Sequence, residues 1–280
     1  AESGHKSVLI VEKEDNFGRG ISSRNSEVIH SGIYYKNNSL KAKYCLQGRK
    51  LLYEFCEKNN VWHEQCGKLI VAQKNQGTEL ENLYQKASAN GIPDVEKINK
   101  QLIVKMEPEI SGETGMFVGC TGIISAHELM SAFFNISQSM YHDYLFKSRV
   151  VDSEPLNDGY KIIIENPTGE TETVTSEWVI NAGGLQSDLI ARMLGNDIKI
   201  PELIYSKGCY FKLSSKWRNR FKHLVYPIPD KEHDSLGIHL SFDQSGNVKL
   251  GPSAHWLDDR TENYTVEDKL LGLFYHEAVQ

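Results

Sequence analysis

The sequence predicts an α/β protein in which a part with a parallel sheet interleaves with a part built mainly from antiparallel strands. Three observations predict this class. The run Val8–Val11 is apolar without alternation, as in a strand buried on both faces of a parallel sheet. Helical segments with capping signals follow this run. Beyond Pro201, short segments alternate polar and apolar residues, a pattern typical of antiparallel sheets.

The helices are predicted from capping signals and from apolar residues at helical spacing. They are a segment capped by Ser39 that runs to about Lys58, one opened by the capping box Thr78–Glu81 and ended by Gly91, one opened by a second capping box at Ser125–Glu128, and one capped by Ser187 that ends before Gly195.

The remaining strands are predicted from short apolar or alternating runs bounded by turn residues. They are residues 67–72, 101–106, 149–151 and 160–165, a longer strand that reaches 178–180 and breaks at Asn181–Gly184, and then 209–213, 224–226, 236–241 and 248–251. The turn Asn157–Gly159 is expected to join two of them.

The composition is that of a globular protein and argues against two function classes. The chain has 280 residues, of which 40% are hydrophobic and 24% charged, enough for one large core or two modest ones. The formal net charge of -6 argues against a general nucleic-acid binder, which usually carries a basic surface. No stretch approaches the ~20 apolar residues of a membrane span, so we expect no transmembrane segment.

The cysteines argue against a disulfide framework and against a zinc knuckle. There are five, an odd number, and they are widely spaced without a C-x-x-C pair. This pattern fits a reducing compartment, so we expect a cytoplasmic protein in which the thiols are packed as small apolar groups. The ten histidines contain no H-E-x-x-H sequence, and no metal site is expected.

Glu12 directly follows the first predicted strand. An acidic side chain at the end of such a strand accepts hydrogen bonds from a ribose in nucleotide-binding α/β folds; the alternative is a solvated acidic residue. The glycine-rich turn that accompanies such a site would fall before residue 1. Ala1–His5 is therefore interpreted as the tail of a crossover helix, and we expect the sequence to be cut inside its first βαβ unit.

Two further segments have the residue types of a cofactor site. Ser22–Asn25 offers four consecutive hydrogen-bond donors, one of them Arg, which suits a diphosphate; the alternative is a solvated loop. Gly32 would allow the close approach of a flat ligand. Asn181–Gly184 places small residues between a strand and a helix. Such residues are needed where a cofactor lies close to the backbone; the alternative is a compact turn that has no room for large side chains.

In their residues and in their order along the chain, these segments resemble the FAD-dependent oxidoreductases of the D-amino-acid oxidase and glycine oxidase superfamily. The resemblance is strongest to its L-2-hydroxyglutarate dehydrogenase/oxidase group. The resemblance covers essentially the whole chain. It is carried by SSRNSEVIHSGIYY (22–35), SLKAKYC (39–45), LLYEFC (51–56), CGKLIVA (66–72), TGIIS (121–125), NAGGLQSD (181–188), KGCYFKL (207–213), YPIPD (226–230), LGIHLS (236–241) and the pair Gly251–Pro252.

The resemblance implies a Rossmann-like FAD-binding domain and a mainly antiparallel substrate domain that forms a roof over the flavin. Both would be discontinuous, with residues 1–58 and 121–197 in the FAD-binding domain and 59–120 and 198–280 in the substrate domain.

The resemblance also implies roles for single residues. The implied FAD contacts are Glu12 to the adenosine ribose, Ser22, Ser23, Arg24 and Asn25 to the diphosphate and flavin side, Val150 to the adenine, Ala182, Gly183 and Gly184 along the cofactor, and His30 with Ser31 and Gly32 at the isoalloxazine ring. The implied substrate contacts are Lys68, Lys207, Tyr210 and His239.

Three departures from the family pattern stand out. The dinucleotide glycines and the C-terminal segment that closes over the flavin are absent, so we expect a fragment that binds FAD poorly. Cys209 stands where hydroxyglutarate enzymes tend to show an acidic residue, and SSRNSEVIH replaces a His-Asn-Ser version of the loop. The last two differences bear on the exact substrate.

For a small 2-hydroxy acid, the Cα hydrogen would pass to flavin N5 as a hydride while a base takes the hydroxyl proton. A neutral histidine suits that base, and His30 and His239 are the candidates; the alternative for each is a histidine that is only hydrogen-bonded in the core. Lys68 or Lys207 would bind the carboxylate. The electron acceptor would be a quinone or oxygen.

Two other functions stay open on the sequence. One is an FAD-dependent oxidase of amino acids or secondary amines, as elsewhere in the superfamily. The other is a non-catalytic fragment or binding protein, which the missing glycine turn favours.

Overall fold

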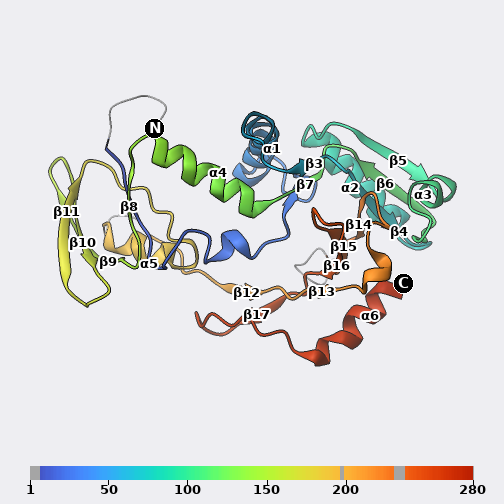
Figure 1. Ribbon diagram of the computed structural model, residues 1–280. Coiled ribbons are helices and arrows are strands. Elements are labelled where there is room, and N and C mark those ends of the chain that lie inside the picture. Colours follow the sequence, from blue (N-terminus) through green and yellow to red (C-terminus); the bar gives the residue numbers. More distant parts are fainter. Residues whose placement is uncertain (1–6, 196–198, 230–236, 280) are drawn as a thin grey trace. The chain divides into compact units, whose positions relative to one another are not determined.

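The computed structural model describes residues 7–195, 199–229 and 237–279, and its elements are shown in Figure 1. The expected helix tail at Ala1–His5 and the first residue of the strand expected at 236–241 lie outside these ranges. The chain divides into two compact units, one formed by Ala1–Asn25 and Ala126–Tyr205 and the other by Ser26–Ser125 and Ser206–Gln280. Residues 26–58, assigned from the sequence to the FAD-binding domain, thus belong to the second unit by contact; the functional domain assignment itself stays a prediction.

The first unit contains a parallel strand pair. Strand β1 (Leu9–Val11) runs parallel to β8 (Asp143–Leu145), with Leu9 opposite Asp143. Helix α4 (Ala126–Ser139) begins where the sequence predicts it, and its Phe134 ring packs on Tyr144 of β8 with 4.8 Å between centroids. The strand is confirmed, but its expected burial on both faces is wrong. Leu9 is 40% exposed because β1 is paired only with β8 among the described strands.

An antiparallel three-stranded sheet and a short helix complete the first unit. Strands β9 (Arg149–Leu156), β10 (Gly159–Glu165) and β11 (Thr171–Ser176) pair in sequence order. The 3-10 turns η1 (Ile21–Ser23) and η2 (Gly184–Gln186) and helix α5 (Ser187–Met193) are the other elements.

Two sequence expectations in this unit are corrected. The strand expected to reach 178–180 ends at Ser176, because no described strand continues the ladder there, and Trp178 and Ile180 are 74% and 90% exposed. Ser187 is the first residue of α5 rather than its cap; Gln186 occupies the cap position, and its side chain makes no capping bond.

The second unit is built on a seven-stranded sheet. Its strand order is β13 (Phe211–Lys212), β16 (Val248–Gly251), β15 (His239–Phe242), β14 (Leu224–Pro227), β4 (Lys68–Ala72), β6 (Thr114–Val118) and β5 (Val95–Asn99). Strands β4 and β14 pair in parallel, and every other neighbouring pair is antiparallel. The expectation of a mainly antiparallel part is therefore confirmed.

Four helices and two small sheets accompany this large sheet. They are α1 (Leu40–Asn59), α2 (Gly77–Ala89), α3 (Lys100–Met106) and α6 (Leu271–Val279), the sheet β2 (Val28–Ile29), β7 (Gly122–Ile124) and β3 (His63–Glu64), and the pair β12 (Tyr205–Lys207) and β17 (His255–Leu257), with 3-10 turns at Ser215–Trp217 and Asp268–Leu270. In Figure 1, α2 and α3 lie beside β5 and β6.

The two faces of strand β4 are covered by different helices. Ile70 packs in the main core with Leu80 and Leu83 of α2. Leu69 belongs to a second cluster with Ile103 of α3. Because side chains alternate along a strand, Lys68 shares the face of Ile70, toward the main core. This alternation brings a lysine into an apolar layer.

Helix α1 confirms its predicted cap, and α3 corrects a predicted strand. The Ser39 hydroxyl accepts from the Ala42 amide at 3.1 Å, as expected of an N-cap. Residues 101–106 form a helix instead of a strand, because Asn99 caps it by accepting from the Leu102 amide at 3.0 Å and Ile103 is buried on the sheet. A short apolar run does not distinguish the two states by periodicity alone.

Helix α2 confirms its predicted end but not its predicted start. Gly91 has φ +68° and follows the last turn, as a C-terminal glycine does. The helix begins at Gly77 with Gln76 at the cap position, and no side-chain capping bond is formed there. The capping box expected at Thr78–Glu81 therefore does not mark the first turn.

Candidate active site

The loop His30–Tyr35 forms one wall of the candidate site. It follows β2, and the C-terminal end of α2 fixes it through two backbone carbonyls. Lys86 Nζ donates to the carbonyl of Tyr34 at 2.5 Å, and Asn90 Nδ2 donates to that of Tyr35 at 3.0 Å. The side chains of this loop are thus positioned by a regular element far away in the sequence.

Gly32 is required in this loop by its backbone and by its packing. Its φ is +90°, and a Cβ there would lie 2.9 Å from Leu46 Cδ1 on helix α1. Close contact with α1 therefore explains the glycine without a ligand, and its expected role beside a flat ring stays a prediction.

Lys68 is the most unusual residue of the site. It opens strand β4, is fully buried, and its Nζ has no hydrogen-bond partner among the described residues. The ammonium lies 4.5 Å from the ring centroids of both Tyr34 and Tyr226, a cation–π arrangement that compensates part of its lost hydration. Burial lowers the pKa of Lys68 to about 7.

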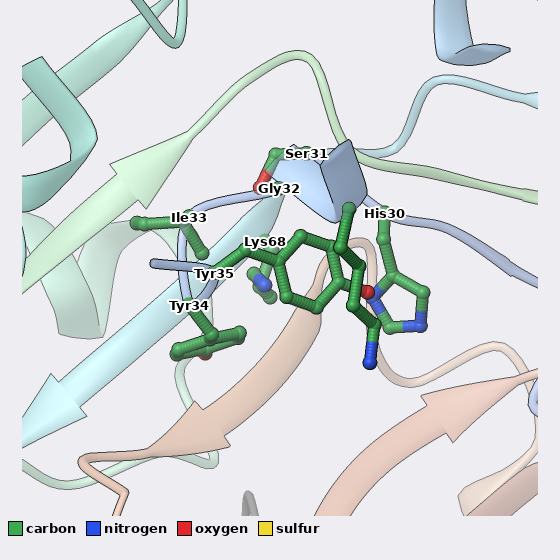
Figure 2. Close-up of a pocket in the computed structure, with 8 residues that line it drawn as sticks. His30, Ser31, Gly32, Ile33, Tyr34, Tyr35 and Lys68 are labelled. Atoms are coloured by element: carbon green, nitrogen blue, oxygen red, sulfur yellow. The ribbon is translucent and has the colours of Figure 1, made fainter. Parts of the chain in front are cut away.

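A cavity of about 290 Å³ opens beside this lysine. It is lined by the loop His30–Tyr35, by Lys68 and by Lys41 of helix α1. Figure 2 shows the His30, Tyr34 and Lys68 side chains around it. The size is near the lower end of the range for small-molecule sites, roughly 300–1,000 Å³. A small metabolite fits such a cavity.

Tyr226 and His239 extend the site across the sheet. Val225 lies opposite Leu240 in the antiparallel pair β14–β15, so the neighbouring residues Tyr226 and His239 also face each other. Their rings stack with centroids 3.8 Å apart. His239 Nδ1 lies 3.1 Å from the carbonyl of Gly237. Because a carbonyl only accepts, Nδ1 carries the proton, and the lone pair of the neutral ring is on Nε2.

Both candidate bases are neutral at physiological pH. Burial lowers the pKa of His239 to about 3, and the nearby Lys68 adds to this effect. Burial likewise lowers the pKa of His30 to about 4, and Lys68 and Lys41 contribute. A neutral imidazole keeps a lone pair and can therefore accept a proton.

Five polar atoms at the site, including Lys68 Nζ, are buried without a hydrogen-bond partner among the described residues. Buried polar atoms nearly always have a partner, so such a group indicates that water or a polar ligand completes the bonding here. At this site they are Ser31 Oγ, Tyr34 OH, Lys68 Nζ, Tyr226 OH and His239 Nε2.

Of the expected substrate residues, the structure brings Lys68 and His239 together and leaves Lys207 apart. Lys207 Nζ donates to the Thr265 carbonyl and to Asn263 Oδ1, and it does not line the cavity. Tyr210 is half-buried, and burial raises its pKa to about 12. Lys249 Nζ lies 5.6 Å from the Tyr210 ring centroid.

Three residues of the site were missed in the sequence. Tyr34 and Tyr226 lie within conspicuous segments, but aromatic residues there are equally consistent with packing. Lys41 lies in the first turn of α1, where a lysine usually means a solvated helix face. One signal in the sequence could have indicated the tyrosines: a lysine begins the otherwise apolar strand KLIVA. A charge in such a buried strand is stabilised only by aromatic or anionic neighbours.

In the first unit, the expected ribose and diphosphate contacts lie near the end of β1. Glu12 is half-buried just after β1, and its Oε1 accepts from the Glu14 amide at 2.9 Å. Residues 22–25 are exposed in and after the turn η1. Arg24 Nη1 donates to the Gly20 carbonyl at 3.1 Å, which holds the guanidinium against the turn.

The other expected cofactor contacts of this unit lie in a strand and in a turn. Val150 is in β9, opposite Ile164. In the small-residue turn, the Gly183 amide donates to Asn181 Oδ1 at 3.1 Å, and a Cβ on Gly183 would lie 2.4 Å from Ile190 Cδ1. This glycine is therefore explained by packing against α5. The roles of Val150, Ala182, Gly183 and Gly184 toward a cofactor stay predictions.

The hydrogen-bonding groups of the first unit fit the parts of FAD that the family resemblance implies for them. A carboxylate has about four acceptor sites, so Glu12 can accept from ribose hydroxyls in addition to the hydrogen bond that it accepts from the Glu14 amide. The exposed hydroxyls of Ser22 and Ser23 with the Arg24 guanidinium offer the charge-assisted donors that a diphosphate needs.

A metal site and a membrane-spanning helix are both not found in the described part of the chain. No cluster of three or more His, Cys, Asp or Glu side chains there could hold a metal ion. No helix within the described ranges is long and apolar enough to span a membrane.

Relatives with matching sequences carry one recurring name. A family model described as FAD dependent oxidoreductase matches residues 1–276. The mitochondrial L-2-hydroxyglutarate dehydrogenase of Bos taurus is 34% identical over 258 residues, which are 89% of this chain and 55% of that protein. L-2-hydroxyglutarate dehydrogenase of Escherichia coli strain K12 is 34% identical over 250 residues, 88% of this chain and 57% of that protein. The chain thus spans little more than half the length of these relatives.

Solved structures share the fold. L-alpha-glycerophosphate oxidase from Mycoplasma pneumoniae with FAD bound has a TM-score of 0.86 at 22% identity, over 96% of this chain and 70% of that one. Glycine oxidase from Geobacillus kaustophilus has a TM-score of 0.79 at 19% identity, over 98% of this chain and 70% of that one. The α/β fold class expected from the sequence is confirmed by these likenesses.

Proposed function

The chain belongs to the family of FAD-dependent oxidoreductases, and on this premise we propose that it oxidises a small 2-hydroxy acid such as L-2-hydroxyglutarate. The family match confirms FAD as the expected cofactor and oxidoreductase as the expected enzyme class. The choice of substrate class is supported by the names of the relatives at 34% identity and by the chemistry of the cavity.

The observation that carries the proposal is the unpaired ammonium of Lys68. A fully buried cation without a hydrogen-bond partner is costly unless a ligand completes its bonding. A carboxylate supplies both the opposite charge and the acceptor atoms. Further donors are the hydroxyls of Tyr34, which lines the cavity, and of Tyr226, whose ring lies 4.5 Å from the ammonium. We therefore assign the carboxylate next to the reacting carbon to Lys68.

The hydroxyl of the substrate loses its proton to a neutral imidazole. His30 lines the cavity, and His239 holds a buried lone pair on Nε2. An anion on Lys68 raises the basicity of both rings, because it offsets the positive charge that lowers their pKa values. Bound FAD would supply the two-electron acceptor for the Cα hydrogen, and loss of that hydride together with the hydroxyl proton would convert the C–OH group to a carbonyl.

Residues of the first unit hold the cofactor in this proposal. Glu12 binds the adenosine ribose, and Ser22, Ser23, Arg24 and Asn25 bind the diphosphate and the adjoining flavin side. The functional domains are those expected from the sequence. We further propose a cytoplasmic location, supported by five free cysteines, and a quinone or oxygen as the electron acceptor.

Single-turnover reduction of the flavin tests the proposal. The protein is saturated with FAD and mixed without oxygen with L-2-hydroxyglutarate, glycine or sarcosine, and the flavin absorbance near ~450 nm is followed. We expect bleaching by L-2-hydroxyglutarate. Bleaching by the amines alone would replace the proposal with an amine oxidase. Protein that stays colourless with added FAD would indicate a non-catalytic fragment.

The acceptor is tested with the reduced enzyme. Reoxidation is timed after mixing with air-saturated buffer or with a soluble quinone. A faster reaction with the quinone indicates a dehydrogenase, and a faster reaction with oxygen an oxidase.

A further inference from the structure

A second lysine lines the cavity that contains Lys68. Lys41 is exposed in the first turn of helix α1, and its Nζ lies 4.9 Å from the centroid of the Tyr35 ring. The cavity is bounded by this residue as well as by Lys68. One ammonium is therefore buried at the sheet, and the other is at the solvent side on a helix.

The two ammonium groups act on the same imidazole. Both Lys68 and Lys41 shift the pKa of His30 downward through their charge, so His30 lies within electrostatic reach of each. Neither lysine forms an ion pair with a carboxylate among the described residues. Lys249, by contrast, has Glu27 at 3.7 Å. The cavity thus has two positive charges that no described carboxylate neutralises, and both are near a candidate base.

We propose that Lys41 binds the second carboxylate of a dicarboxylic 2-hydroxy acid and so makes the site select dicarboxylates over monocarboxylates. The inference rests on the proposed function, which assigns the first carboxylate to Lys68. A dianion with a charge at each end matches two separate ammonium groups, whereas a monocarboxylate leaves Lys41 without an anion.

The burial of the two lysines decides which end of the substrate each one binds. The reacting carbon must lie close to a base, and the buried lysine is surrounded by Tyr34, Tyr226 and the neutral rings. The distal end then points toward the solvent side, where Lys41 remains hydrated. An exposed ion pair contributes modestly to binding, so Lys41 tunes selectivity rather than making binding possible.

Lys43 is a matched control on the same helix. It is an exposed lysine two residues further along α1, and its Nζ lies 5.6 Å from the Tyr44 ring centroid. Residues two apart on a helix do not face the same side, and Lys43 does not line the cavity. Lys43→Met removes the same charge from the same helical turn without touching the site.

The test compares two keto acids that are not themselves oxidised. The FAD-saturated full chain is titrated calorimetrically with 2-oxoglutarate and with 2-oxopentanoate, in which a methyl group replaces the distal carboxylate. We expect the wild-type protein to prefer 2-oxoglutarate. Lys41→Met weakens 2-oxoglutarate binding up to about fivefold and leaves 2-oxopentanoate unchanged, while Lys43→Met changes neither. Lys41→Arg keeps the preference, and Lys68→Met weakens both ligands.

The outcomes separate this inference from the proposed function. Equal weakening of both keto acids by Lys41→Met, or no weakening of either, overturns the role of Lys41 while the proposed function stands. A wild-type protein that binds both ligands equally also overturns the role of Lys41 and leaves the proposed function standing. A wild-type protein that binds neither keto acid and is not reduced by L-2-hydroxyglutarate overturns both proposals.

Discussion

The imidazole of His239 stacks on the ring of Tyr226, with centroids 3.8 Å apart and planes inclined by 14°. The same tyrosine ring lies 4.5 Å from the Lys68 ammonium. One fully buried aromatic side chain therefore excludes water from both a candidate base and the Lys68 ammonium. This shared burial is what keeps the histidine neutral and makes the charge state of the lysine sensitive near neutral pH.

The pH profile of kcat/KM should fall above neutrality. The pKa of Lys68 is lowered to about 7, so the free enzyme loses its ammonium as the pH rises through that value. The imidazoles, with pKa values lowered to about 4 and about 3, are already neutral above pH ~5 and contribute no change there. We expect a plateau from pH ~5 to ~7 and a decline that approaches tenfold per pH unit above it, measured with L-2-hydroxyglutarate.

The profile of kcat should differ from that of kcat/KM. An anion bound beside Lys68 stabilises the ammonium, so the decline in kcat moves to higher pH. Lys68→Met should lose the basic limb altogether. A basic limb of unchanged position in that variant would assign the titration to another group.

Replacing Lys68 by Met should stabilise the fold while it weakens binding. The pKa of Lys68 is lower in the folded chain, about 7, than its ordinary value of 10.5, so its charge destabilises the folded state fully below pH ~7 and progressively less up to pH ~10.5. Lys68→Met should raise the free energy of unfolding by about 1–4 kcal/mol at pH 6, and this gain should shrink as the pH approaches 10. Urea unfolding at both pH values measures it.

Lys249→Met is the comparison for that stability change. Lys249 is paired with Glu27 at 3.7 Å, so its removal should not stabilise the protein. If Lys68→Met destabilises the chain at every pH, the ammonium is not the uncompensated charge inferred from its surroundings.

His239→Asn should slow flavin reduction without disturbing the loop that holds the ring. An Asn amide can donate to the Gly237 carbonyl as Nδ1 does, at 3.1 Å in the wild type, but it lacks the Nε2 lone pair. We expect reduction by L-2-hydroxyglutarate to slow by about 10²–10⁴-fold in stopped flow, with keto-acid binding nearly unchanged.

His63→Asn is the matched control, because His63 Nδ1 makes the same kind of contact, 2.9 Å from the carbonyl of Val61 two residues earlier. The His63 ring packs on Tyr53, with 5.7 Å between centroids, rather than on Tyr226 beside Lys68, so its replacement should leave the rate unchanged. If His30→Asn causes the large loss and His239→Asn changes the rate less than threefold, the proton goes to His30 instead.

Local patterns predicted much of the fold. The Ser39 cap and the Gly91 terminus could be predicted because each depends only on residues of its own helix end. Ser39 accepts a hydrogen bond from a backbone amide three residues later, and Gly91 directly follows the last turn of its helix. Residues 101–106 were misassigned because packing of Ile103 on the sheet, which is not visible locally, decides between helix and strand. The segment 178–180, in which Trp178 and Ile180 are exposed, was misassigned because an apolar run forms a strand only where another strand pairs with it.

The candidate site was predicted less completely than the fold. Lys68 and His239 were identified through family resemblance, and the structure brings them together at Tyr226. In the sequence, Lys207 was as good a candidate as Lys68. The sequence does not show that the Lys207 ammonium donates to the Thr265 carbonyl, which only the fold reveals. Lys41 was missed, because an exposed lysine on a helix can be identified as a candidate site residue only when the cavity beside it is known.

Gly32→Ala should destabilise the protein, whereas Gly48→Ala should stabilise it. Gly32 has φ +90°, and a Cβ there would lie 2.9 Å from Leu46 Cδ1, so alanine strains the backbone and forces the Leu46 side chain of α1 to shift. We expect a loss of about 1–3 kcal/mol in the free energy of unfolding. Gly48 lies in the same helix with nothing within 4 Å of a Cβ, so alanine there should add about 0.5–1 kcal/mol. Because residues 30–35 line the cavity, Gly32→Ala should also weaken 2-oxoglutarate binding, and Gly48→Ala should not. Equal stability of the two variants in urea would show that the loop tolerates a side chain at position 32, and the positive φ would then not constrain the site.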